Sequence, residues 1–136
     1  NFFCKTIIRK EDKFDSSKSY STTPFSSDYL SFTKYDDGTM YLRVKTYTSR
    51  IADYGKGVNL ILEDGSTMNF PNSETKPKTT SGKLWAYTSF IRVSKEEASI
   101  LAEKRITDMK IYVHTRENMD FDIGNNFKNY VNCIIK

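Results

Sequence analysis

The segment between residues 84 and 113 restricts the fold of this chain more than any other part of its sequence. Residues 84–93 form a long run rich in aromatic and β-branched side chains, which favour strands. The next residues have the spacing of a capping box, in which the Ser94 hydroxyl accepts the N–H of Glu97 and the Glu97 carboxylate reaches back. A second alternating run covers residues 106–113. A strand, a capped helix and a strand in this order predict an α+β fold.

Two other segments have the pattern of β-hairpins. Asp-Asp-Gly-Thr at 36–39 separates alternating runs at 29–35 and 40–47, and Glu-Asp-Gly at 63–65 separates runs at 58–62 and 66–70. An Asp-Gly pair between alternating runs is a strong signal for a tight hairpin turn. We expect Pro71 to end the last of these strands, because proline lacks the N–H that a ladder hydrogen bond needs. Residues 72–82 are then expected to form the longest surface loop.

The two ends of the chain carry different signals. Residues 2–8 have the composition of a strand, and residues 10–28 that of an extended loop or irregular edge. Residues 119–123 alternate like a short strand, which Gly124 and the two asparagines after it are expected to end. A final helix should follow, since its apolar residues recur at i, i+3, i+4 and i+7. These residues are Phe127, Tyr130, Val131 and Ile134.

Together the elements predict an α+β fold that is mostly β. We expect an antiparallel β-sandwich or open barrel of hairpins, with one short helix between strands and a C-terminal helix. One β-rich domain should cover residues 1–136, with an irregular N-terminal segment over residues 1–28. A chain of 136 residues buries roughly two-thirds of its unfolded surface, so its core needs neither a metal nor a disulfide.

The two cysteines, Cys4 and Cys133, lie near opposite ends of the chain. We expect free, buried thiols, because buried cysteine behaves as a small hydrophobic residue. A bridge between the two is the alternative, since the ends of a domain often lie close together. No CxxC pair or His/Cys cluster occurs, so the sequence predicts no metal site and no cofactor.

The charge pattern bears on the class of partner. The formal net charge is +4, and acidic and basic residues are interleaved. Nucleic-acid-binding tails carry blocks of about five or six like charges, and because this chain has none, nucleic acid is not favoured as a partner. No apolar run approaches the roughly 18 residues of a transmembrane helix. We expect a soluble protein whose compartment the sequence does not specify. It would lie in the cell envelope or be secreted if a leader has been removed.

One strand face is the first candidate for a contact surface. In the run 40–47, alternate residues point to opposite sides, so Met40, Leu42 and Val44 should face the core. The opposite face carries aromatic and cationic side chains, namely Tyr41, Arg43, Lys45 and Tyr47. Exposed tyrosine and arginine side chains are enriched at binding hot spots. We therefore expect the face of Tyr41, Arg43 and Tyr47 to contact a partner.

Trp85 and Tyr87 form a second candidate surface, because they alternate onto one face of their predicted strand. Exposed Trp and Tyr side chains stack on sugar rings and bases or contact proteins. Ile91 and Val93 have the same parity, however, and this favours the interpretation that the whole face belongs to the core. The alternative is that Trp85 and Tyr87 are exposed and contact a ligand or partner.

The residues that could support catalysis form no motif. His114 is the single histidine, near the end of a predicted strand, and we interpret it as a surface residue. Asp120 and Asp122 would share one strand face, but nothing in the sequence places a pair of carboxylates in a cleft. No Gly-rich phosphate loop occurs in a βαβ setting. The sequence therefore predicts no catalytic residue.

Three segments carry a resemblance to a bacterial family: residues 56–65, the run 87–91 with the capping box at 94–97, and residues 106–112. The spacing of Phe127, Tyr130 and Cys133 is similar too. In this order they resemble the small, uncharacterised β-rich proteins common in gut bacteria of the Bacteroides group. The resemblance implies a bacterial or mobile-element origin and a β-rich domain. It transfers no functional residue, because that family has no assigned activity.

These observations predict a non-catalytic binding or structural module, since metal ligands, nucleophile motifs and cofactor loops are all missing from the sequence. Contact with another protein ranks first. A carbohydrate-binding module or a small hydrolase is the alternative. A carbohydrate site should show an exposed aromatic side chain flanked by Asn, Asp or Arg, and a hydrolase should show a pocket lined by His114 or by two carboxylates with perturbed pKa values.

Overall fold

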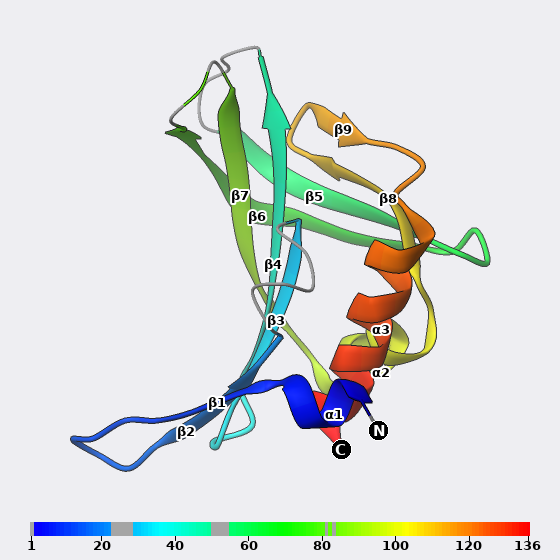
Figure 1. The fold of residues 1–136 in the computed structure, drawn as a ribbon. Coiled ribbons are helices and arrows are strands. Elements are labelled where there is room, and N and C mark those ends of the chain that lie inside the picture. The colour runs from blue at the N-terminus through cyan, green and yellow to red at the C-terminus, as the bar shows by residue number, and fades with distance from the viewer. Residues whose placement is uncertain (1, 23–28, 50–54, 81, 83) are drawn as a thin grey trace.

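The computed structural model describes residues 2–22, 29–49, 55–80, 82 and 84–136, and it is built around one long antiparallel sheet (Figure 1). The strand order is β1-β2-β3-β4-β7-β6-β5-β8-β9. Because the order starts at β1 and ends at β9, the sheet has two edges and does not close. This confirms the predicted fold class, α+β and mostly β. The strands are β1 (Ile8–Glu11), β2 (Lys18–Ser21), β3 (Leu30–Tyr35), β4 (Met40–Thr48), β5 (Gly55–Leu62), β6 (Thr67–Thr79), β7 (Trp85–Val93), β8 (Ile106–Ile111) and β9 (His114–Arg116), and the helices are α1 (Phe2–Thr6), α2 (Lys95–Glu103) and α3 (Phe121–Ile135).

Strand β6 turns the sheet through a corner. Its residues 76–79 pair with β7, whereas its residues 67–75 pair with β5. We call the part formed by β1, β2, β3, β4 and β7 sheet A, and the part formed by β5, β8, β9 and the first half of β6 sheet B. In Figure 1 the strands of sheet B cross those of sheet A at a steep angle. A strand that passes from one sheet to the other is the usual corner of an orthogonal sandwich.

The predictions for Pro71 and for residues 72–82 are wrong, because β6 continues through both of its prolines. The β5–β6 register jumps from Lys56 opposite Glu74 to Val58 opposite Phe70, so Pro71 lies in a bulge that requires no ladder bond from it. Pro77 lies beyond the last described β5–β6 pair and is opposite Tyr87 of β7. The bulge at Pro71 therefore lets β6 continue past a residue that a regular ladder would not accept.

The core fills the angle between the two sheets. Along β4, buried residues alternate with half-buried ones, which confirms the predicted inward side of that strand. Both Asp-Gly hairpins form as expected, β3 with β4 and β5 with β6. The largest fully buried side chains come from both sheets and from the helices α2 and α3, and they include Phe32, Leu42, Leu60, Tyr87, Leu101 and Phe127.

Helices α2 and α3 close one end of this angle. The capping box of α2 is confirmed: the Ser94 N–H donates to Glu97 Oε1 at 2.9 Å, and the Glu97 N–H donates to Ser94 Oγ at 3.1 Å. The four residues of the predicted apolar stripe of α3 are buried. Helix α3 contacts α2, β3 and β8. None of the described helices is long and apolar enough to span a membrane.

The start of α3 differs from the prediction. The strand expected over residues 119–123 is absent, and Gly124 lies inside the helix instead of capping it. Asp120 is the N-cap, and its Oδ1 accepts the N–H of Asp122 at 2.9 Å. This cap favours a helix start at Phe121 over the strand that the alternation of residues 119–123 predicts. A Cβ on Gly124 would lie 2.7 Å from the Ile106 carbonyl oxygen and 2.4 Å from Arg105 Cγ. The helix thus begins close against the start of β8, at a place where only glycine fits.

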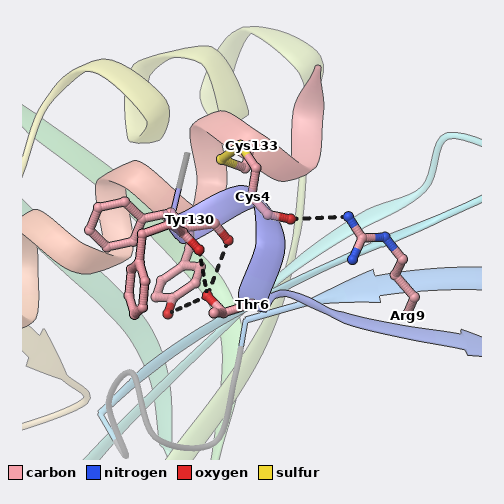
Figure 2. The surroundings of a disulfide bond; sticks show 7 residues. Cys4, Thr6, Arg9, Tyr130 and Cys133 are labelled. Atoms are coloured by element: carbon pink, nitrogen blue, oxygen red, sulfur yellow. Dashed lines mark hydrogen bonds between the residues drawn. A yellow bond between two sulfur atoms is a disulfide. The ribbon is translucent and has the colours of Figure 1, made fainter.

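The N-terminal segment is a helix, not the predicted strand, and the expectation of free thiols is wrong. Cys4 in α1 is bonded to Cys133 in α3, with 5.2 Å between their Cα atoms. Figure 2 shows this bond beside the hydroxyls of Thr6 and Tyr130, which are 3.0 Å apart. The ring of Phe3 meets that of Tyr130 edge to face at 5.0 Å. A five-residue helix is not stable alone, so these contacts with α3 decide the local structure.

Two strands appear where the sequence gives weak signals. β2 lies inside the segment expected to be irregular, and it forms an edge hairpin with β1 (Figure 1); residues 23–28 lie outside the described residues. β9 follows β8 after a two-residue loop, whose first residue, Tyr112, has a φ of 56°. A tyrosine in this left-handed region is uncommon, and the loop contains no Gly, Asn or Asp to indicate it.

Candidate functional site

A groove of about 580 Å³ opens where β6 leaves β7, and we call it the fork groove. The β6–β7 register ends at Lys76 opposite Thr88, whereas β7 runs on to Val93. Within the described strands, residues 89–93 therefore pair with β4 on one side and have no β6 partner on the other, where Phe90, Ile91 and Arg92 line the groove. The lining residues are Asn69, Phe70, Pro71, Asn72, Ser73, Glu74, Lys76, Thr88, Phe90, Ile91 and Arg92.

Two buried hydroxyls fasten the point of the fork. Ser89 Oγ donates to the carbonyl oxygen of Glu74 at 2.8 Å, across the last contact between the diverging strands. Thr75 Oγ1 donates to the carbonyl oxygen of Gly55 at 3.2 Å and ties β6 to β5. Both side chains are almost fully buried, Ser89 at 1% and Thr75 at 0% exposure. Each hydroxyl satisfies a backbone carbonyl that would otherwise lack a hydrogen bond in the interior. These two bonds hold β6 in place at the point where it leaves β7.

The groove has an apolar floor and a mixed rim. Phe70 and Ile91 belong to the core and form the floor. Phe90 points the other way from Ile91 and is 69% exposed, which is unusual for a phenylalanine in the middle of a strand. The remaining rim is polar or charged, with Asn69, Asn72, Glu74, Lys76 and Arg92 exposed to solvent. An exposed aromatic ring above an apolar floor, surrounded by polar groups, is typical of a contact surface.

Two of the predicted contact residues lie next to this rim. Tyr41 is directly opposite Arg92, and Arg43 is directly opposite Phe90, so each pair shares the outer face of sheet A. Arg43 Nε donates to Ser31 Oγ at 2.8 Å, and the Tyr41 ring meets that of Tyr35 edge to face at 6.0 Å. The face of β4 that carries Tyr41 and Arg43, predicted from the alternation of that strand, therefore adjoins the groove rim on β7.

The other three predicted contact residues lie elsewhere. Tyr47 and Trp85 are at the opposite end of the same strand pair, where Tyr47 is opposite Ala86. Trp85 is half-buried and packs against the core. Tyr87 is fully buried, with the ring of His114 centred 4.0 Å from its own. Tyr87 therefore has no surface for a partner, as expected if its strand face belongs to the core.

The outer face of sheet A around the groove is predominantly cationic. Arg43, Lys45, Lys76, Lys78 and Arg92 share it, since each lies on β7 or directly opposite a β7 residue of the same parity. Among the lining residues the acidic one is Glu74. The pKa of Asp37, in the β3–β4 turn, is lowered mainly by hydrogen bonds from Thr39 and further by the charge of Arg92. A surface with this charge balance attracts anionic groups.

The residues considered for catalysis do not meet in the groove. The His114 Nε2 is buried and has no hydrogen-bond partner among the described residues, and burial lowers the pKa of its imidazole. The Asp120 carboxylate caps α3. Among the described residues, no three His, Cys, Asp or Glu side chains are grouped to hold a metal ion. The groove lining offers one carboxylate, that of Glu74, and no histidine or cysteine.

Sequence reasoning missed the central residue of the groove, Phe90. The signal that could have found it is its parity, because a strand that turns Ile91 and Val93 inward must turn Phe90 outward. The groove itself depends on β6 continuing past Pro71 and changing partner, and no local pattern in the sequence indicates that.

Comparison of the chain with protein-family models, with curated proteins and with solved structures gave no match. The resemblance to β-rich proteins of the Bacteroides group accordingly stays a prediction, and the function is argued from the geometry above.

Proposed function

We propose that this chain is a non-catalytic binding module that contacts another protein through the fork groove and the adjoining face of Tyr41 and Arg43. The observation that carries the proposal is Phe90, which is 69% exposed on a groove rim between cationic side chains. Water contact of a large aromatic ring is unfavourable, and a partner that covers the ring would recover that free energy.

Size and composition support a contact surface of this kind. A volume of about 580 Å³ is comparable with that of small-molecule pockets, roughly 300–1,000 Å³, so the groove can take in side chains of a partner. Binding hot spots are enriched in aromatic and arginine side chains set in a polar rim. Phe90, Arg92 and Tyr41 meet this description on adjacent strands.

The Cys4–Cys133 bond supports a place for the encounter. Disulfides persist in oxidising compartments such as the periplasm and the cell exterior, and they are rare in the reducing cytosol. We therefore propose that the module meets its partner in an oxidising compartment.

A carbohydrate-binding module is the second candidate, because Asn69 and Asn72 lie beside Phe90 in the groove. Amide side chains next to an aromatic ring suit a sugar, whose hydroxyls need hydrogen bonds and whose ring face stacks. The cations on this face favour a protein with acidic groups over a neutral glycan.

The test is a peptide array and a glycan array, each probed with the oxidised protein and two variants. Phe90→Ala removes the exposed aromatic ring of the groove rim, and Phe14→Ala is the matched control, since Phe14 is 88% exposed in the β1–β2 hairpin. We expect peptide binding that falls at least tenfold in Phe90→Ala and is unchanged in Phe14→Ala. Glycan binding that depends on Phe90 would establish the second candidate instead, and binding that ignores Phe90 would overturn both.

A further inference from the structure

The backbone of β7 at the fork groove points to a specific mode of binding, and this inference rests on the proposed function above. We propose that the partner contributes an extended acidic segment, which adds to residues 89–93 of β7 as a new antiparallel strand and places an acidic and an apolar side chain two residues apart.

The free edge of β7 is the first observation. β4 pairs with β7 along its whole length from Trp85 to Val93, whereas β6 pairs only as far as Thr88. In a strand, alternate residues direct their N–H and C=O groups to opposite edges, so part of the backbone of residues 89–93 faces the groove. A strand edge of this kind is a template for an added strand.

The geometry of the fork fixes the orientation and the length of the added segment. β6 runs antiparallel to β7, so a segment that continues its ladder is antiparallel too. Five residues of β7, 89–93, have no β6 partner, and at about 3.3 Å per residue they match a short segment of roughly four or five residues. Because Lys76 occupies the position opposite Thr88, the segment must leave the sheet at the point of the fork.

Side chains on the rim fix the order of residues. Phe90 and Arg92 are two residues apart on the same exposed face of β7. In an antiparallel pair, the partner residue opposite Arg92 precedes the one opposite Phe90 by two positions. The matching segment therefore reads acidic–x–apolar from its N-terminus, with the carboxylate against Arg92 and the apolar side chain against Phe90.

Charge complementarity selects an acidic partner over a neutral or basic one. Arg92 and Lys76 line the groove, Arg43 lies directly opposite Phe90 on β4, and Glu74 is the acidic residue in the lining. Attraction to these cations accelerates encounter and fixes register, and it weakens as salt rises. Residue x is not specified by the rim, since it points to the other face of the new strand.

The experiment uses blocked, fluorescently labelled peptides with the probe sequence Ser-Glu-Val-Phe-Ser. Three controls keep the composition similar: the reversed order Ser-Phe-Val-Glu-Ser, a Lys-for-Glu peptide, and a peptide N-methylated along its backbone. We expect fluorescence anisotropy to show at least tenfold weaker binding of each control. We also expect hydrogen exchange at residues 89–93 to slow in the complex, which a contact made by side chains alone would not cause.

Variants of the protein make the register testable. Arg92→Glu should lose at least tenfold affinity for the Glu peptide and gain the Lys peptide, which a general loss of folding cannot produce. Lys10→Glu is the matched control, because Lys10 is an exposed cation of β1, far along the strand order from β7. It should change neither affinity.

The outcomes separate this inference from the proposed function. Phe90-dependent binding of array peptides that ignores residue order and N-methylation would overturn the added strand and leave the binding module intact. Glycan binding at the groove, or peptide binding unaffected by Phe90→Ala, would overturn both. Absence of binding by the probe at about 1 mM peptide, while other Phe90-dependent peptides bind, would overturn the acidic–x–apolar order.

Discussion

Two regions of this sandwich are built in opposite ways. At the closed end, α2 and α3 fill the angle between the sheets, a disulfide ties α1 to α3, and Gly124 lets α3 approach β8 closely. At the fork, β6 and β7 part from each other, two hydroxyls hold the point of divergence, and Phe90 is exposed to water. The region around α3 is held by covalent and close packing contacts, whereas the fork exposes an aromatic ring that packing does not require.

Removing the disulfide should have the largest effect on stability. The double substitution of Cys4→Ser and Cys133→Ser frees a loop of more than 100 residues, so we expect a loss of about 2–5 kcal/mol in the free energy of unfolding. Urea unfolding monitored by circular dichroism would measure it. The wild-type protein in reducing buffer should reproduce the change, and equal stability with and without the bond would contradict a closed end that depends on it.

Gly124→Ala tests the contact between α3 and β8. Alanine at an open helix position usually stabilises by about 1 kcal/mol, but here the added Cβ would clash with the Ile106 carbonyl. We expect a loss of about 1–3 kcal/mol, measured by the same unfolding experiment. Gly82→Ala is the control, because its nearest neighbour would be 4.0 Å away. A stabilised Gly124→Ala protein would show that the closed end is loosely packed.

His114, whose ring lies against Tyr87 of the core, gives the free energy of unfolding a pH dependence. Burial lowers the pKa of its imidazole below the ordinary value of about 6.5, so the unfolded chain takes up the proton first as pH falls. Stability should therefore be complete above about pH 6.5 and decrease as the pH falls below that value. Thermal unfolding between pH 7.5 and 5 would measure the slope, and His114→Gln should flatten it. An unchanged slope would assign the dependence to other groups.

Phe90→Ala should have the smallest effect on stability. An exposed side chain away from the core changes the free energy of unfolding by less than about 0.5 kcal/mol, so the variant should unfold like the wild type. The melting temperature of Phe90→Ala should equal that of the wild type while its peptide affinity falls, because we expect Phe90 to contribute to binding and not to folding. A strong destabilisation would mean that Phe90 has a structural role and would contradict the contrast between the fork and the region around α3.

Local signals predicted a large part of the fold. The two Asp-Gly turns, the Ser94–Glu97 capping box and the alternation along β4 are each encoded within a few neighbouring residues, and each forms as expected. The helix α1, the passage of β6 through Pro71 and the early start of α3 were not predicted. Each depends on a partner distant in sequence, such as Cys133 for α1 or the bulge against β5 for Pro71.

The candidate site could be predicted only at residues whose position follows from the alternation of inward and outward side chains along one strand. Tyr41 and Arg43 come from the outward face of β4, and the same reasoning applied to β7 would have added Phe90. The groove between β6 and β7 comes from a strand that exchanges one neighbour for another, which is a property of long-range register. For Tyr87 the same alternation favoured the core, and its burial agrees with that interpretation and removes Tyr87 from the candidate contacts.

The Cys4–Cys133 bond also decides how the molecule responds to mechanical force. Tension applied between the two ends of the chain passes from residue 4 to residue 133 through a covalent bond, so the segment between them carries none of it. While the bond is intact, the sheets cannot be sheared or unzipped by pulling on the chain outside residues 4 and 133. Reduction would shift the tension onto α1 and α3 first, and the bond thus acts as a chemical switch on the extensibility of the whole chain.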